Sequence, residues 1–237
     1  MIDPAEKSTE VAAPRVAQAE VAEGMLLDGR LGLFHREQRW LAVADLHYGY
    51  EISRRMAGGL WPMWGMETIE ERLRALIVAL KPRTLILVGD IVDGKAAPEE
   101  AIAWMSGLSG LCDELILIEG NHDRGAVTQH FNFLPWYRTD GFFFHHGHRK
   151  DTRNHIADGE IEVTGHLHPA VNFNDGAGTK LKLPALAMER EANGADERWI
   201  LPAFSPWAGG GHYKPAGKKS QCHQWACSTQ RVFEVAT

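Results

Sequence analysis

The chain has 237 residues, of which 44% are hydrophobic and 24% are charged. This balance excludes an intrinsically disordered chain and a coiled coil, and no apolar run approaches the roughly 18 residues of a membrane-spanning helix. The 25 basic and 31 acidic residues leave a net charge of −6, which argues against a domain that wraps nucleic acid by charge alone.

The first half of the chain predicts alternating strands and helices. Residues 1–22 contain no stretch that fixes a core face, so we expect a mobile leader followed by one domain over residues 23–237. Asp28-Gly29 between two apolar runs predicts a hairpin, and residues 40–44 predict a buried strand. A helix is predicted over residues 68–80, with capping-box spacing of Thr68 and Glu71 at its start.

The remainder of the chain predicts one more helix and many short strands. The helix is expected over residues 98–107, with Pro98 in its first turn. Strands are predicted over residues 84–88, 115–118, 142–144, 161–163, 171–173, 181–188, 198–204 and 231–235. Strand–helix alternation followed by short strands after about residue 140 is typical of an α/β or α+β domain.

The chain has three cysteines, too few for a disulfide framework, so we expect reduced thiols in a cytoplasmic protein. Cys222, His223 and Cys227 could suggest a zinc knuckle, but no second ligand pair lies near them in the sequence.

Five predicted strands end in polar clusters, which account for many of the twelve histidines. The clusters are Asp45-x-His47, Gly89-Asp90, Gly120-Asn121-His122-Asp123, His146-Gly147-His148 and Gly165-His166-Leu167-His168. Each cluster alone is a weak signal, but five in succession, each after a buried strand, bring these side chains together at one sheet edge. Carboxylate, imidazole and amide ligands suit Mn²⁺, Fe²⁺ or Zn²⁺ rather than Ca²⁺ or Mg²⁺.

These five blocks, in this order, resemble those of the calcineurin-like metallophosphoesterases, and the resemblance spans about residues 25–205. It implies a four-layer α/β/β/α sandwich of two mixed sheets that binds two divalent transition metal ions. Mn²⁺ is the metal expected first, with Fe²⁺ or Zn²⁺ as alternatives. One ion would be held by Asp45, His47, Asp90 and His168, and the other by Asp90, Asn121, His146 and His166. A hydroxide shared by the ions would attack phosphorus. His122 would stabilise the transition state and protonate the leaving group.

Within that family the flanking residues look most like the SbcD-related phosphoesterases and the ligase-associated DNA damage response endonucleases. The strings are Ala44–Glu51, Gly165–Pro169 and Leu201–Phe204, whereas Gly89–Asp93 and His146–His148 follow the generic family form. The resemblance implies a phosphodiester substrate, DNA or RNA, and partner proteins in DNA repair.

Few residues follow position 205, so DNA contacts are expected from loops or a partner rather than a capping domain. No membrane contact is expected.

Several alternatives stay open at this point. A phosphomonoesterase or small-nucleotide phosphodiesterase would use the same metals, and a non-catalytic scaffold would not need His122. Asp123 could orient His122 or cap a turn, and Asp93 is expected to stabilise its own loop. His145 and His148 are expected to pack or to face solvent.

Two other groups of residues could touch the substrate. Trp61 and Trp64 could stack on a base or form a packing or dimer patch. The pairs Arg54-Arg55 and Arg149-Lys150, with Arg153, could grip phosphates or form a solvated face.

Overall fold

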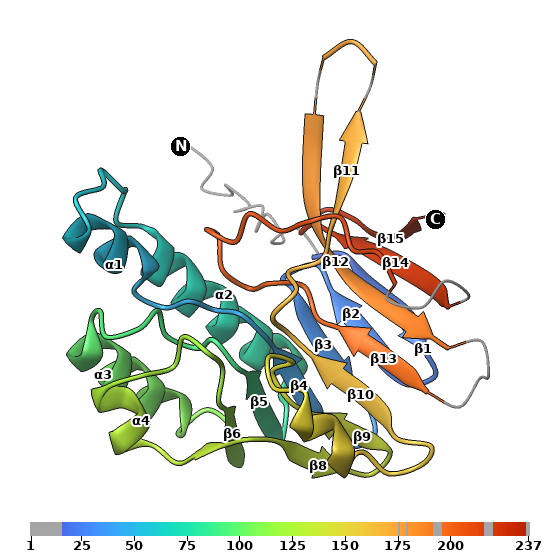
Figure 1. Ribbon diagram of the computed structural model, residues 1–237, viewed down its shortest axis with the longest axis horizontal. Helices are drawn as coiled ribbons and strands as arrows, with labels where there is room; N and C mark the ends of the chain where they lie inside the picture. The colour runs from blue at the N-terminus through green and yellow to red at the C-terminus, as the bar shows by residue number, and fades with distance from the viewer. Residues whose placement is uncertain (1–15, 175, 179, 192–195, 216–219, 236–237) are drawn as a thin grey trace, which may run out of the picture.

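The computed structural model describes residues 16–174, 176–178, 180–191, 196–215 and 220–235. Two β-sheets pack face to face, and the helices gather on the outer side of one of them (Figure 1). None of the helices in these ranges is long and apolar enough to cross a bilayer.

The first sheet has seven strands, whose order in space is their order in the chain. They are β1 (Gln18–Ala22), β2 (Met25–Asp28), β3 (Gly32–His35), β4 (Trp40–Val43), β5 (Thr84–Val88), β6 (Glu114–Ile118) and β7 (Phe133–Leu134). The first four pair antiparallel, and β4 to β7 pair parallel. Parallel neighbours need crossover connections, which here contain the α-helices.

The helices are α1 (Tyr50–Met56), α2 (Gly65–Leu80), α3 (Pro98–Leu108) and α4 (Ala126–His130), all between β4 and β7 in the chain. The face of α2 toward the sheet carries the buried residues Ile69, Leu73, Leu76 and Ile77, spaced as one helical stripe requires. These crossovers leave the carboxyl ends of β4, β5 and β6 at one edge of the sheet.

The second sheet runs in the order β15-β14-β12-β13-β10-β9-β8, and β11 pairs with β12 as a projecting hairpin (Figure 1). Its strands are β8 (Tyr137–Thr139), β9 (Phe142–Phe144), β10 (Ile161–Thr164), β11 (Ala170–Asn174), β12 (Lys180–Arg190), β13 (Glu197–Ile200), β14 (Gln221–Cys227) and β15 (Val232–Val235). Strands β9, β10 and β13 are parallel, so their carboxyl ends also share one edge.

Aromatic side chains fill the space between the sheets. Trp40 of β4 meets Phe142 and Phe144 of β9, each with ring centroids 5.1 Å apart, and Phe142 also meets Trp199 of β13. All four side chains are buried. This contact between the sheets confirms the predicted sandwich of two mixed sheets.

The outer face of the second sheet carries a buried polar network under the 3₁₀-helix η1 (Asp151–His155). Glu162 is 2% exposed, and its carboxylate lies 2.8 Å from Nε2 of His145, 2.9 Å from Arg153 and 3.6 Å from Arg198. Burial by itself would raise the pKa of Glu162, but the hydrogen bond with His145 and the charges of Arg198 and Arg153 hold it below its ordinary value.

Most of the predicted elements are present, with three corrections. Strand β1 lies inside the predicted leader, so regular structure is already present at Gln18, before the expected start at Met25. Residues 1–15 lie outside the described ranges. Helix α2 begins at Gly65, and Thr68 bonds Trp64 O within it instead of capping it. The strand predicted over residues 198–204 ends at Ile200.

The positions of two cysteines bear on the zinc knuckle that the sequence analysis weighed. Cys222 and Cys227 are five residues apart on strand β14, so their side chains point to opposite faces and cannot share a zinc ion. Neither of them forms a disulfide, and Cys112 does not either. Short elements without a periodic pattern, such as α1, α4, β7 and β8, were not predicted.

Candidate metal centre

The predicted site residues lie where the parallel strands of both sheets end. Asp45 and His47 follow β4, Asp90 follows β5, Asn121 and His122 follow β6, His146 follows β9, and His166 and His168 follow β10. Phe204 N donates to Ala44 O at 2.8 Å, which ties the segment after β13 to the end of β4. The two sheets therefore bring all these residues to one edge of the sandwich.

The backbone at this edge is strained. Asp45, His47, Asp90, His166 and His168 all have positive φ, between 45° and 71°. For non-glycine residues this conformation costs about 1–3 kcal/mol each and concentrates at functional sites. Asp45 N donates to Gly89 O at 3.1 Å and His47 N donates to Asp90 O at 2.9 Å, so hydrogen bonds between neighbouring loops hold the strained residues.

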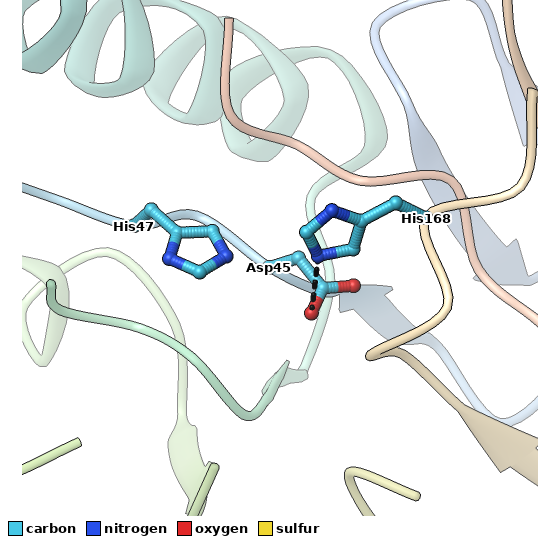
Figure 2. Close-up of side chains that lie close together, drawn as sticks. All are labelled: Asp45, His47 and His168. Atoms are coloured by element: carbon cyan, nitrogen blue, oxygen red, sulfur yellow. Dashed lines mark ion pairs between the residues drawn. The ribbon is translucent and has the colours of Figure 1, made fainter. Parts of the chain in front are cut away.

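The first set of side chains, the Asp45 group, consists of Asp45, His47 and His168. His168 Nε2 lies 3.2 Å from Asp45 Oδ1, and Figure 2 shows its ring directed at that carboxylate with His47 beside them. Both carboxylate oxygens of Asp45 also accept the backbone N–H of His166, at 3.0 Å. One ligand atom from each residue of the group lies within 4.8 Å of the others, a spacing that could hold a metal ion.

The second set, the Asp90 group, consists of Asp90, His146 and His166, again with ligand atoms within 4.8 Å of one another. His146 Nε2 lies 3.3 Å from Asp90 Oδ2 and 3.2 Å from Asn121 Oδ1. His146 Nδ1 faces Val88 O at 3.2 Å, which leaves Nε2 as its ligand atom. Asn121 is thus adjacent to this group.

The two groups adjoin through His47 and Asp90, whose Nε2 and Oδ2 atoms are 3.8 Å apart. His47, Asp90 and His122 form a third set that satisfies the same 4.8 Å spacing. This geometry leaves two possibilities for His122, which sequence reasoning placed outside the ligands: it could ligate a metal or face the substrate.

Close approaches at two glycines support this arrangement. A Cβ on Gly120 would lie 2.1 Å from Asp90 N, and a Cβ on Gly165 would lie 2.7 Å from Asp45 Oδ2. Only glycine at these positions leaves the two carboxylates where they are.

The electrostatics of the centre favour a bound cation. Burial alone would raise the pKa of Asp90, but the hydrogen bond and charge of His146 and the N–H of His122 hold it well below its ordinary value. Burial would likewise lower the pKa values of His47 and His146, yet the neighbouring carboxylates raise both. Positive charge is thus stabilised at this edge, whether as protons on imidazoles or as metal that displaces them.

Unpartnered nitrogens make the same point. Nδ1 and Nε2 of His47 and Nε2 of His168 are buried, and their contacts with nearby carboxylates do not have hydrogen-bond geometry within the described part of the chain. A buried polar atom without a partner costs free energy, which a metal–nitrogen bond would remove. The donor set of carboxylate, imidazole and amide fits a divalent transition metal.

Two acidic residues near the centre differ in how they compare with the sequence analysis: Asp93 has a contact that was not expected, and Asp123 follows one of its two open alternatives. Asp93 Oδ1 lies 3.1 Å from Nδ1 of His122 and 3.4 Å from Nδ1 of His47, so it contacts the site rather than only its own loop. Asp123 accepts backbone N–H groups of Ile91, Val92 and Gly120 at 2.7–2.9 Å and is 4% exposed. The open choice for Asp123 is therefore decided in favour of capping the turn.

The two histidines beside His146 differ in position. His145 is buried in the network with Glu162, on the outer face of the sheet and away from the centre. The ring of His148 lies 5.3 Å from that of His146, and burial with that neighbour lowers the pKa of His148 to about 4. Sequence reasoning missed Asp93 as a contact of His122, although its position three residues after Asp90 in the same loop was a usable signal.

The chain is similar to known proteins in sequence pattern and in fold. The profile of the calcineurin-like phosphoesterase family matches residues 39–219, well over half of the chain. The nuclease MPE of Pseudomonas putida has a similar structure, with a TM-score of 0.63 and 21% identity over 93% of this chain and 100% of that one. The phosphoesterase YfcE of E. coli gives a TM-score of 0.49 and 17% identity over 83% of this chain and 98% of that one. No curated protein sequence matches significantly.

Proposed function

This chain belongs to the calcineurin-like phosphoesterase family, a family of metal-dependent hydrolases, and from that we propose that it cleaves phosphodiesters with two divalent metal ions. The observation that carries this proposal is the pair of adjoining sets, the Asp45 group and the Asp90 group, joined by His47 and Asp90. A two-metal site clamps the attacking and leaving oxygens of an in-line displacement, and it needs two cation positions side by side.

In the proposed centre Asp45, His47, Asp90 and His168 would hold the first ion. Asp90, Asn121, His146 and His166 would hold the second, so Asp90 would serve both. Support comes from the 4.8 Å spacing within each set and from the unpartnered nitrogens of His47 and His168. The imidazole-rich ligands favour Mn²⁺, with Fe²⁺ or Zn²⁺ as alternatives.

When bound, the ions supply Lewis-acid chemistry, lowering the pKa of coordinated water and offsetting the charge on phosphate. The chain itself supplies a proton through His122, whose side chain is 43% exposed at the edge of the centre. Burial would raise the pKa of Asp93, but the hydrogen bonds from His47 and Ser53 lower it, so Asp93 is an anion that can accept a hydrogen bond from His122 Nδ1–H. With Nδ1–H held in this way, the protonated imidazole of His122 gives its Nε2 proton to the leaving oxygen and ends neutral.

We further propose that one domain, from β1 to residue 237, carries the site, and that the substrate is DNA or RNA. Nucleic acid is the first substrate to test because the P. putida relative is a nuclease. The three cysteines form no disulfide, which supports the proposed cytoplasmic location, and a DNA-repair role is part of the proposal.

A substrate panel tests the proposal: bis(p-nitrophenyl) phosphate, p-nitrophenyl phosphate, cyclic nucleotides, and single- and double-stranded DNA and RNA, each with Mn²⁺. We expect cleavage of the diester and of nucleic acid. Hydrolysis of the monoester alone would instead assign a phosphomonoesterase, and hydrolysis of none of them would make the fold a scaffold.

A further inference from the structure

Four aromatic rings from separate segments gather beside the metal centre. This aromatic cluster consists of Tyr50 at the start of α1, Trp61 and Trp64 in the loop before α2, and Trp207 after β13. Trp207 contacts the other three rings. Its ring centroid lies 4.3 Å from that of Trp64, 5.2 Å from that of Trp61 and 6.4 Å from that of Tyr50. In Figure 1 the segment after β13 runs back toward α2 and the helical layer.

The segment that carries two of the rings also exposes large apolar side chains to solvent. Met56 is 79% exposed, Leu60 is 99%, Met63 is 46% and Trp64 is 44%. These are four of the seven large exposed apolar side chains in the described ranges, and they fall within nine consecutive residues. Single exposed apolar residues need no explanation, whereas a contiguous exposed patch marks a binding surface.

A buried carboxylate holds the cluster in place. Glu51 is fully buried, with Oε1 accepting Met66 N at 2.8 Å and Oε2 accepting Trp207 Nε1 at 3.1 Å. A Cβ on Gly65 would lie 2.1 Å from Trp207 Nε1, so glycine is needed for this close approach. The Trp207 ring is therefore fixed before any ligand arrives, which lowers the entropy cost of binding.

The cluster is continuous with the metal centre. The Tyr50 ring lies 6.5 Å from the ring of His47, a member of the Asp45 group. The guanidinium of Arg54 lies 4.6 Å above the Tyr50 ring, and Arg55 follows it in the last turn of α1. One continuous surface thus carries cationic groups, flat aromatic rings and the proposed phosphate site.

We propose that the aromatic cluster stacks unpaired nucleobases of a strand whose phosphodiester lies at the metal centre. Base faces are available for stacking only where the strand is single, and aromatic platforms accept any base because every base has a π-face. Arg54 and Arg55 favour a polyanionic strand over a second copy of this chain, which has a net charge of −6. This inference rests on the proposed function and names the part of the substrate that its site would recognise.

The test compares two oligonucleotides of the same length, one with normal bases and one with abasic tetrahydrofuran residues flanking the scissile phosphate. For the unaltered chain we expect kcat/KM to be higher on the base-bearing strand by about 5- to 150-fold, the effect of one stacked base. Trp64→Leu and Trp61→Leu should abolish most of this preference, and Trp64→Phe should retain it because a planar ring remains.

Val78→Ala is the matched control, since Val78 is 65% exposed on α2 and lies outside the cluster. Hydrolysis of bis(p-nitrophenyl) phosphate, measured on every variant, reports the metal centre separately. If the unaltered chain cleaves neither this diester nor either strand, the proposed function fails. If it cleaves them but shows no preference for bases, or if Trp64→Leu keeps the preference, the stacking inference alone is overturned. A dimer that dissociates in Trp64→Leu, with the preference unchanged, would assign the cluster to a second copy.

Discussion

Adding one methyl group at Gly120 should disable the proposed metal bridge without replacing any of the proposed ligands. The Cβ of Gly120→Ala would lie 2.1 Å from Asp90 N and 2.2 Å from Asp90 Oδ1. Optimal contacts begin near 3.5 Å, so Asp90 or the Gly120 loop must retreat by more than about 1 Å. Both obstructing atoms belong to a residue with φ of 48° and 2% exposure, so little freedom exists to absorb the shift.

The expected losses of folding stability and of catalytic rate follow from the displacement of Asp90. Overpacking of this kind costs about 1–3 kcal/mol of folding stability, which lowers the melting temperature without unfolding a stable domain. A shift of about 1 Å in a positioned group lowers catalysis by about 10²-fold. Because Asp90 is proposed to touch both ions, Gly120→Ala should lose occupancy at both positions.

The assay is elemental analysis, thermal melting and diester hydrolysis on the same samples. Gly107→Ala is the control, since a Cβ there meets nothing within 4 Å and replaces a helical glycine, a change worth about 0.5–1 kcal/mol of added stability. Gly165→Ala, whose Cβ would lie 2.7 Å from Asp45 Oδ2, should deplete one ion rather than two. A Gly120→Ala protein with two tightly bound ions and undiminished turnover would refute the bridging role of Asp90.

Four further outcomes are expected. Chelation should abolish hydrolysis, and Mn²⁺ should restore it better than Mg²⁺ because imidazole-rich sites prefer transition ions. Asp90→Asn should lose more metal than His47→Ala or His166→Ala, as only Asp90 would contact both ions. His122→Gln should keep both ions and lose about 10²–10⁴-fold in rate on DNA, with a milder loss on a nitrophenyl ester, whose leaving group needs no proton. In the metal-free protein, Glu162→Gln should lower the free energy of unfolding at pH 7 by about 3 kcal/mol, the cost of breaking a buried pair.

The effect of Glu162→Gln on the free energy of unfolding depends on pH, because proton binding to Glu162 is coupled to folding. The folded-state pKa of Glu162 lies below its unfolded value, so its contribution is present above about pH 4.5 and is lost as the pH falls through the folded pKa. Urea unfolding of the two proteins should therefore converge at low pH, and a constant difference would contradict the assignment.

Each of the other three predictions would be contradicted by a specific result. Full turnover in excess chelator would exclude metal catalysis, and two full-occupancy ions in Asp90→Asn would remove the bridge. An equal rate loss on both substrates with a missing ion would make His122 a ligand, the alternative that its spacing to His47 and Asp90 allows.

The sequence by itself determined the layout of the centre. Apolar strands that stop at Asp45, Asp90, Asn121, His146 and His166 place these residues at one edge, because parallel strands end together. The hairpin at Asp28-Gly29 and the helix near residues 65–80 were readable for the same reason: turn residues and apolar periodicity are local signals. The assignment of the individual metal ligands stays a prediction.

Only the tertiary structure decided which residues distant in the chain meet. Asp93 reaches His122, and Asp123 caps a loop, because of how three loops fold over one another. Trp207 packs on Trp64, although the two residues are far apart in the sequence. The buried carboxylate of Glu51 holds Trp207 in place, and no local sequence pattern marks Glu51 as special. β1 gains its order from pairing with β2, so its own sequence reads as a leader. Such contacts depend on the route of the backbone through space, and residue spacing along the chain carries no record of that route.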